Sequence, residues 1–468
     1  MPGEPGGLNS LSAADILARL GRLGIHPGLD RMYRALDLLG HPEKGPATFQ
    51  IVGTNGKGST AAAIDAILLS AGYRTGRYTS PHLSDVRERI LISGERLPAP
   101  LFEDLVRDVD SLCRSHQLTL TFFEFLTVVA FRAFSLTRCE VLVLEAGLGG
   151  RWDATTSSSP LLTVLTQVGL DHEEILGKGI ERIFEEKVAV GRDGKPFVAM
   201  LHDSSLREKF LAHSRDKGFI PVLNGRDFDG VWASPDNRSG DPRPLNYRGR
   251  WGNREIASTL SATYQIDNLS SAIAALEWSP LPVPHHSFRE GLLTLENPGR
   301  LETVLKSPRV LLDGAHNPPA VQALCQSLRD RFGPSGEFGF FLAIHSVKDW
   351  NEMIRILAPE GKAFFFTDSP NRGVSPLPLD GDWVAPSQMV QALKSMDRFV
   401  PGFCEIREGE RDTLLGEAME WAMAKGNRVL VVTGSLYLVG AVRPFFKPSS
   451  EPPFFSPNER DLPGTILS

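Results

Sequence analysis

Thr48-Phe-Gln-Ile-Val-Gly-Thr-Asn-Gly-Lys-Gly-Ser-Thr60, followed by a mostly apolar run from Ala61 to Ala71, is the stretch that decides the fold. It predicts a strand, a phosphate-binding loop and a helix, in that order. The glycines at 53, 56 and 58 let the backbone turn sharply and direct successive N–H groups toward an anion. The dipole of the following helix adds to this attraction at its N-terminus. Lys57 is a natural partner for the β- and γ-phosphates of a nucleotide, and Ser59 or Thr60 for a phosphate or its Mg²⁺.

The loop departs from the common G-x-x-x-x-G-K-[ST] pattern in two places. Position 51 is Ile, and Gly58 stands between Lys57 and the two hydroxyl residues. A simple packing turn between a strand and a helix is the alternative interpretation, but the lysine and the hydroxyls favour phosphate binding.

Composition is that of an enzyme with large apolar cores. The chain has 468 residues, 41% of them hydrophobic, which predicts two or three domains. No segment approaches the ~18 apolar residues that a membrane span needs. The formal net charge of −6 gives no electrostatic reason to expect nucleic acid or an anionic membrane as a partner.

Cysteine spacing and the N-terminus bear on the compartment. The four cysteines show no C-x-x-C spacing, which argues against a structural zinc site and against a disulfide framework. The first residues, Met-Pro-Gly-Glu-Pro-Gly-Gly, do not resemble a secretory signal. We therefore expect a cytoplasmic protein.

Apolar runs and helical patterns alternate along the chain. Runs rich in Val, Leu, Ile and Phe are typical of strands buried on both faces of a parallel sheet. The segments between them carry apolar residues at three- and four-residue spacing, as crossover helices do. This pattern predicts two doubly wound α/β domains. The predicted strands are 48–52, 140–146, 161–168, 196–201, 309–312, 337–344, 362–367 and 428–433, and the helices are 102–113, 124–134, 320–332 and 413–424.

A domain boundary is predicted near 296–300, where Pro298 and Gly299 break a helical stretch. The first domain then covers 1–296 and the second 297–445. Residues 225–258, rich in Gly, Pro, Asp and Asn, predict hairpins and loops at the end of the first domain. The Pro- and Phe-rich tail 446–468, whose pattern starts at Pro444, shows no helical period, and we expect it to be loosely ordered.

Polar residues end several predicted strands, where open parallel sheets bind their ligands. Glu145 ends one strand and is a candidate Mg²⁺ ligand, although a solvated strand-end glutamate is an equal alternative. Asp171 and His172 end another, and a histidine there is more often a capping or hydrogen-bonding residue. The Asp313-Gly-Ala-His316 turn follows the first strand of the second domain, where Asp313 could serve the turn alone. Taken by itself, Lys187 predicts a solvated surface lysine.

Together these pieces resemble one family, the folylpolyglutamate synthases and dihydrofolate synthases of the Mur ligase superfamily. The resemblance implies an α/β fold: a P-loop ATPase-type, doubly wound domain like the Mur ligase central domain, and a smaller Rossmann-like C-terminal domain. The matching stretches occur in the family's order. They are Gly53-Thr-Asn-Gly-Lys-Gly-Ser59, Thr79-Ser-Pro-His-Leu83 with Glu88-Arg-Ile90, Thr121-Phe-Phe-Glu124, Glu145 to Thr155, Gly169-Leu-Asp-His172, Glu186-Lys187, Pro298-Gly-Arg300, Asp313-Gly-Ala-His-Asn-Pro318, Lys348-Asp349 and Thr433-Gly-Ser-Leu436.

The resemblance also implies roles for individual residues. Ser80 and Glu145 would bind one Mg²⁺, and Glu145, His172 and a carbamylated Lys187 a second. CO₂ addition would turn the lysine ammonium, which repels Mg²⁺, into an anionic oxygen ligand. ATP would be bound by Thr54, Asn55, Gly56, Lys57, Gly58, Ser59, Thr60, Asn268, Arg300 and Asp313. The pterin-bearing substrate would lie at Thr121, Phe122, Phe123, Glu124 and Asp153, and the catalytic residues would be Lys57, Lys187, Asp313 and His316.

The implied reaction is ATP-dependent amide formation between a pterin-linked carboxylate and the amine of L-glutamate, by a monomeric enzyme. The carboxylate would first be phosphorylated, and glutamate would then displace phosphate from the acyl phosphate. Substrates would be dihydropteroate, reduced folates or both, and the Thr121 to Glu124 segment favours both. Polyglutamylation alone, a P-loop nucleotide hydrolase and a non-catalytic folate-binding protein are the alternatives.

Overall fold

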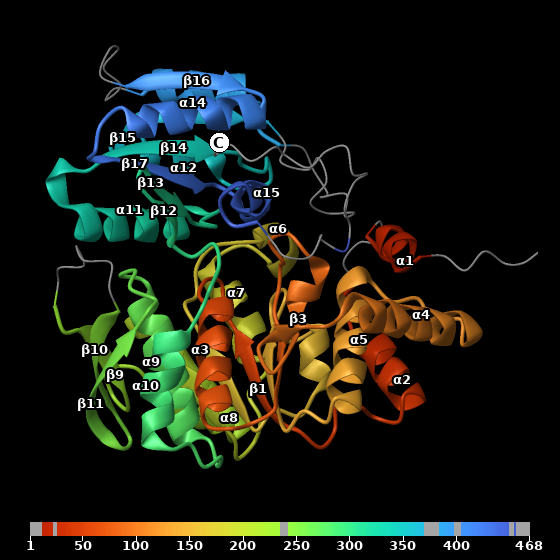
Figure 1. The fold of residues 1–468 in the computed structure, drawn as a ribbon. Helices are drawn as coiled ribbons and strands as arrows, with labels where there is room; N and C mark the ends of the chain where they lie inside the picture. The colour runs from red at the N-terminus through yellow and green to blue at the C-terminus, as the bar shows by residue number, and fades with distance from the viewer. Residues whose placement is uncertain are drawn as a thin grey trace, which may run out of the picture.

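The protein, seen in a computed structural model, has a larger N-terminal and a smaller C-terminal α/β unit, one above the other in Figure 1. The structure describes residues 12–21, 26–234, 242–368, 383–396, 404–448 and Phe454. The linker 295–301 joins the two units, between helix α10 and strand β12. The predicted boundary at 296–300 falls within this linker, and the exact division stays a prediction.

An eight-stranded sheet forms the centre of the larger unit, with strand order β4-β3-β2-β5-β1-β6-β7-β8. The six strands from β2 to β8 in this order run parallel, whereas β3 and β4 form an antiparallel edge. The central strand β1 (Ala47–Val52) pairs with β5 (Val141–Glu145) and β6 (Leu162–Leu165), so three strand ends meet beside the glycine loop. The other strands are β2 (Thr75–Tyr78), β3 (Ile90–Ile92), β4 (Glu95–Arg96), β7 (Pro196–Ala199) and β8 (Ile220–Leu223).

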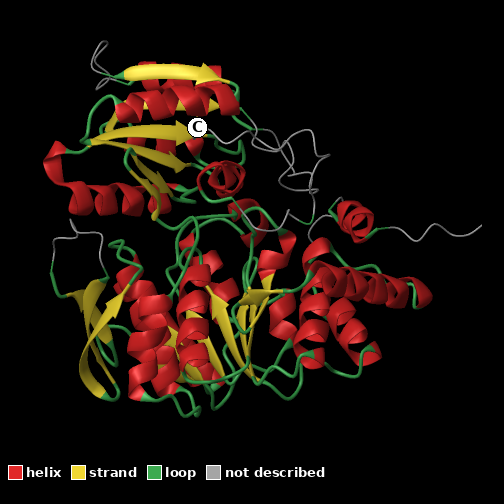
Figure 2. Cartoon of the chain, in the orientation of Figure 1, coloured by secondary structure: helices red, strands yellow, loops and turns green. Residues whose placement is uncertain are grey.

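Helices cover both faces of this sheet, as Figure 2 shows. On one face α3 (Lys57–Ser70) and α9 (Gln265–Trp278) pack against alternate residues of the central strands, and α10 (His285–Thr294) packs against α3. On the other face lie α4 (Ala99–Ser115), α5 (Phe122–Leu136), α7 (Ile180–Val188) and α8 (Ser204–Lys217), with α1 (Ala13–Leu20) and α2 (Asp30–Leu38) outside α4 and α5. The predicted hairpins of 225–258 form a separate antiparallel sheet of β9 (Asp229–Trp232), β10 (Arg243–Gly249) and β11 (Gly252–Ser258).

The smaller unit is a six-stranded sheet with strand order β12-β13-β17-β14-β15-β16. Only β12 is antiparallel among the strands that the structure describes here. The strands are β12 (Glu302–Lys306), β13 (Arg309–Leu312), β14 (Glu337–Leu342), β15 (Gly361–Thr367), β16 (Glu405–Gly409) and β17 (Arg428–Thr433). One face is covered by α11 (Pro318–Phe332), α12 (Trp350–Leu357) and α13 (Pro386–Lys394), and the other by α14 (Arg411–Met423) and α15 (Leu436–Phe446).

The predicted fold class, two doubly wound α/β units, is confirmed, and each predicted strand and helix is present. Three strands end two or three residues earlier than predicted, at Leu165, Ala199 and Leu342. Apolar residues such as Ile344 remain buried after the strand ends, so the apolar run is longer than the strand.

The C-terminal segment differs from the prediction at its start. Helix α15 continues through Pro444 to Phe446, because a proline in the last turn removes only one helical hydrogen bond. Of the tail beyond Pro448, the described part is Phe454, which packs edge-on against Phe102 of the larger unit at 5.0 Å between ring centroids. The expectation of a loosely ordered tail otherwise lies outside the described residues. None of the described helices is long and apolar enough to cross a membrane.

Candidate active site

The glycine loop between β1 and α3 has the conformation that its sequence predicts. Gly53 and Gly56 have positive φ angles of 151° and 87°. A Cβ on Gly56 would lie 2.0 Å from the Asn268 side-chain oxygen, so glycine is needed for conformation and for space. Helix α3 begins at Lys57. Lys57 Nζ donates hydrogen bonds to the carbonyl oxygens of Gly53 and Thr54, each at 3.1 Å. The ammonium therefore lies directly under the loop.

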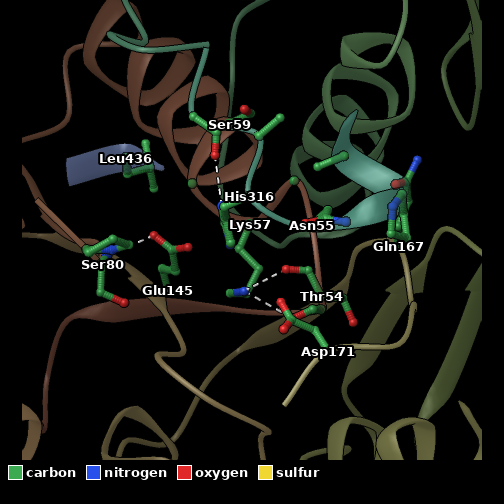
Figure 3. A pocket seen from close by; sticks show the side chains of 18 of the residues that line it. Thr54, Asn55, Lys57, Ser59, Ser80, Glu145, Gln167, Asp171, His316 and Leu436 are labelled. Carbon is green, nitrogen blue, oxygen red and sulfur yellow. Dashed lines mark hydrogen bonds between the residues drawn. The ribbon is translucent and has the colours of Figure 1, made fainter. Parts of the chain in front are cut away.

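A cavity at the carboxyl ends of the central strands brings most of the predicted site residues together (Figure 3). Its walls come from both units, because the linker and the β13–α11 turn close it from the side of the smaller sheet. The predicted residues that line it are Thr54, Asn55, Gly56, Lys57, Gly58, Ser59, Ser80, Glu145, His172, Lys187, Asn268, Arg300, Asp313 and His316.

Glu145 is a buried carboxylate with no ion-pair partner among the described residues. It is 4% exposed, and its Oε2 accepts one hydrogen bond, from the Ser80 backbone N–H at 3.0 Å. Burial raises its pKa, and the positive charge of Lys57 is the strongest opposing influence. The equal alternative, a solvated strand-end glutamate, is therefore wrong, and a bound cation would stabilise the charged form of this desolvated carboxyl group.

Lys187 differs from the surface lysine that its sequence alone predicts. It is 3% exposed and forms no hydrogen bond or ion pair with the described residues. Burial and the nearby Lys57 lower its pKa to about 7. Helix α7 points its last turn at the cavity, because Ile183, Phe184 and Val188 pack the same side of the helix into the core.

Asp171 connects the two units. One oxygen accepts a hydrogen bond from Lys348 Nζ at 2.7 Å, and the other from Asn317 Nδ2 at 3.1 Å. Asn317 also exchanges hydrogen bonds with Asn55 of the glycine loop. Although burial opposes it, the Lys348 ammonium holds the pKa of Asp171 well below its usual range. This cluster closes the cavity on one side.

His172 lies beside the same lysine. Its backbone is left-handed, with φ 55°, and its Nε2 is 3.5 Å from Lys348 Nζ. Burial is the main cause that lowers the pKa of its imidazole, so the ring is neutral, and its Nε2 faces the Lys348 ammonium.

Asp313 and His316 are held by neutral groups. Asp313 accepts hydrogen bonds from the Tyr264 hydroxyl at 2.7 Å, the Leu301 N–H at 2.8 Å and the Ala315 N–H at 2.9 Å. His316 Nδ1 lies 2.8 Å from the Gly314 carbonyl, which fixes the proton on Nδ1 and leaves Nε2 as an acceptor. Burial lowers the pKa of His316 to about 4, so its ring is neutral at pH 7.

The predicted pterin segment does not line this cavity. Thr121 and Glu124 form a capping box at the start of α5, and Glu124 also pairs with Arg31 at 2.8 Å. Asp153 accepts hydrogen bonds from the N–H groups of Gly147, Leu148 and Thr155, and so shapes the loop after β5. Phe122 and Phe123 are half-buried and pack against the core of the larger unit, where the Phe123 and Tyr78 ring centroids lie 5.6 Å apart.

One predicted ATP residue lies outside the cavity wall, and three residues without a predicted role belong to the site. Thr60 is fully buried, points its hydroxyl at the Asn268 carbonyl and is not part of the cavity wall. Lys348, Asn317 and Tyr264 belong to the site, and the first two stand in motifs whose individual roles the sequence did not reveal. Among the described residues, no three His, Cys, Asp or Glu side chains form a metal cluster on their own.

Comparison with known proteins gives consistent results. Residues 301–444 match the family model described as the C-terminal domain of dihydrofolate synthetase. The dihydrofolate synthase/folylpolyglutamate synthase of Bacillus subtilis is 30% identical over 433 residues, which are 90% of this chain and 95% of that protein. The Escherichia coli FolC structure in complex with DHPP and ADP has a TM-score of 0.79 and 27% identity, over 92% of this chain and 97% of that one. The bifunctional Yersinia pestis enzyme complexed with AMPPNP and Mn has a TM-score of 0.77 and 27% identity, over 92% of this chain and 97% of that one.

Proposed function

Because the chain belongs to the family of dihydrofolate synthases and folylpolyglutamate synthases, it is an ATP-dependent ligase, and we propose that it adds L-glutamate both to dihydropteroate and to reduced folates. One observation carries the proposal. The glycine loop, the buried carboxylate of Glu145 and the Asp313–His316 turn of the second sheet line the same cavity. A nucleotide hydrolase would need the loop and the carboxylate, but not the turn from the second unit.

The chemistry requires an activated carboxylate, because a free carboxylate is a poor electrophile. The γ-phosphate of ATP is transferred to the pterin-linked carboxylate, which gives an acyl phosphate and ADP. The amine of glutamate then attacks the acyl carbon, the C–O bond to phosphate breaks, and an amide and inorganic phosphate result. Lys57 would leave the two loop carbonyls that it now contacts and offset charge on the γ-phosphate during transfer.

The polar residues of the cavity fit a divalent metal. Glu145 supplies a buried carboxylate that accepts a hydrogen bond from the Ser80 backbone N–H, and His172 supplies a neutral imidazole. We propose Ser80 and Glu145 as ligands of one ion and Glu145, His172 and carbamylated Lys187 as ligands of a second. When bound, the metal would neutralise phosphate charge as the γ-phosphate is transferred. Lys348 Nζ, 3.5 Å from His172 Nε2, would have to withdraw from that nitrogen for the second ion to bind.

The state of Lys187 supports its carbamylation. Only a neutral amine attacks CO₂, forming the N–C bond of a carbamate and releasing one proton. A lysine with a pKa of about 7 is largely neutral at physiological pH, whereas an ordinary lysine is not. The product would be an anion at a position where burial and Lys57 disfavour an ammonium.

The second half of the reaction would use His316. The ammonium of glutamate must lose a proton before its nitrogen can attack the acyl carbon. We propose that His316 accepts that proton at Nε2, since Nδ1 is held by the Gly314 carbonyl. Asp313, held by Tyr264 and two backbone N–H groups, would fix the turn that carries His316. Arg300, in the linker, would contact ATP.

The pterin would lie against Phe122 and Phe123, which pack against the core but whose half-buried rings remain partly exposed. Thr121, Glu124 and Asp153 would support this position through the cap and the loop that they form. Both substrates would use it, because they share the pterin bicycle and the p-aminobenzoyl group. They differ in the glutamyl unit and in the reduction state of the pterin.

The test is ADP release by purified protein with Mg-ATP and L-glutamate, with 7,8-dihydropteroate, with tetrahydrofolate, or with neither. Release that requires a pterin and occurs with both supports the proposal. Release with tetrahydrofolate alone would restrict the enzyme to polyglutamylation, and equal release without a pterin would contradict ligase activity. A monomer in the cytoplasm stays our prediction, which size-exclusion chromatography and cell fractionation would check.

A further inference from the structure

Arg89 is a buried arginine that lacks an anionic partner among the described residues. It ends the 3₁₀ turn Val86–Arg89, just before β3, and is 5% exposed. Arg87, two residues earlier, is equally buried but pairs with Asp85 at 2.7 Å. A buried cation without a counter-ion is costly unless a ligand supplies the missing charge.

The contacts of Arg89 hold it rigidly but leave its charge uncompensated. Its Nε donates to His82 Nδ1 at 2.9 Å, so the proton of His82 must be on Nε2 and the ring is neutral. The guanidinium carbon also lies 5.4 Å from the centre of the Phe122 ring. The positive charge of Arg89 also acts on the hydroxyls of Tyr78 and Tyr437, which stay neutral because burial raises the pKa of both.

The position of Arg89 relates it to the substrate rather than to the nucleotide. It contacts Phe122, which belongs to the proposed pterin position. It also acts electrostatically on Glu145, but less strongly than Lys57 and Arg300 do, and it does not line the nucleotide cavity. Arg89 therefore contacts the proposed pterin position and lies outside the nucleotide cavity.

A folate substrate brings two carboxylates into this region. Its terminal glutamyl residue has a γ-carboxylate, which must reach the γ-phosphate, and an α-carboxylate, which does not react. Dihydropteroate has a single carboxylate, which reacts. The Arg89 guanidinium lies outside the nucleotide cavity, so its position suits the α-carboxylate, which does not react.

We propose that Arg89 binds the α-carboxylate of the terminal glutamyl residue of a folate substrate, held in position by His82 and Phe122. This inference rests on the proposed function and extends it. Arg89 is then a specificity residue for polyglutamylation, because the first addition of glutamate to dihydropteroate offers it no second carboxylate. The planar guanidinium can bind a carboxylate in bidentate fashion, which a lysine at this position could not do.

The experiment compares tetrahydrofolate with its α-carboxamide analogue, using the wild type and Arg89→Met. The wild type should use the amide with a kcat/KM lower by roughly 100-fold, the usual scale for a lost partner of a buried charge pair. Arg89→Met should use both compounds about equally and about as poorly as the wild type uses the amide. Arg96→Met, which changes a partly exposed arginine of the same hairpin, should discriminate like the wild type.

Each outcome decides the question. Equal discrimination by wild type and Arg89→Met would overturn the proposal, as would a wild type that accepts the amide as well as the acid. Arg89→Lys, which keeps the charge, guards against misfolding and should show intermediate discrimination. If the wild type released no ADP with tetrahydrofolate, the proposed polyglutamylation activity would be wrong. That result can be told apart from a failure of the Arg89 proposal, which shows in the ratio of kcat/KM for the acid and the amide.

Discussion

Carbamylation of Lys187 is a prediction whose magnitude follows from the burial of one amine. At about pH 7.5, a lysine with the ordinary pKa of 10.5 is neutral in about one molecule in a thousand, whereas one with a pKa of about 7 is neutral in about three quarters. The reactive form is thus enriched about 700-fold. Lys187 should take up CO₂ at neutral pH, while exposed lysines do not.

The perturbation is removal and return of CO₂ at a series of pH values. Protein freed of CO₂ at low pH is incubated with ¹³C-bicarbonate, and the carbamate carbon is followed by ¹³C NMR together with pterin-dependent ADP release. Because the folded-state pKa is lowered, the carbamate should appear between about pH 6 and 8, and not between about pH 9.5 and 11.5. Activity should rise with the same midpoint.

Two variants make the assay specific. Lys187→Ala should lose the carbamate resonance and nearly all activity, part of which added acetate should restore by supplying a carboxylate. Lys195→Ala, which removes an exposed lysine from the turn after the same helix, should change neither. A resonance that survives in Lys187→Ala, or an appearance midpoint near pH 10, would refute the reasoning.

Three further predictions concern the metal, domain closure and domain packing. Glu145→Gln should lower kcat by at least about 100-fold and abolish the recovery that Mg²⁺ produces after EDTA treatment, since the amide cannot neutralise a cation; unchanged metal dependence would exclude this carboxylate as a ligand. Lys348→Met removes the 2.7 Å ion pair that joins the two units, and small-angle scattering should show a more extended molecule than the wild type with an ATP analogue and folate bound; a profile equal to that of the wild type would show that the pair does not hold the two units together. Gly440→Ala should destabilise the protein by about 1 kcal/mol or more, because the new Cβ would lie 1.9 Å from the Leu83 carbonyl oxygen. Gly416→Ala in helix α14, which has open space around it, should stabilise the protein by about 0.5–1 kcal/mol. Thermal unfolding of both variants would check this, and equal melting temperatures of the two would contradict it.

Local patterns accounted for the fold class and for one side of the site. Strands with continuous apolar runs and helices with a 3.6-residue period depend on short segments, so β1, α3 and the loop between them could be predicted from residues 48–72. Residues at the carboxyl ends of neighbouring parallel strands must share one edge of the sheet, which is why Glu145 and His172 were found as candidates.

The sequence by itself determined the strand–loop–helix unit, the alternation of strands and helices and the residue types at the strand ends, because these follow from backbone geometry and short-range periodicity. Only the tertiary structure decided the charge state and exposure of those residues. Lys187 is buried with a lowered pKa because Lys57 and the core surround it. Asp171 meets Lys348, 177 residues later, because the smaller sheet closes over the larger one. Arg89 forms no ion pair among the described residues because the groups that it contacts, His82 and Phe122, are neutral. Desolvation and charge pairing depend on which distant segments pack together, and no local pattern contains that information.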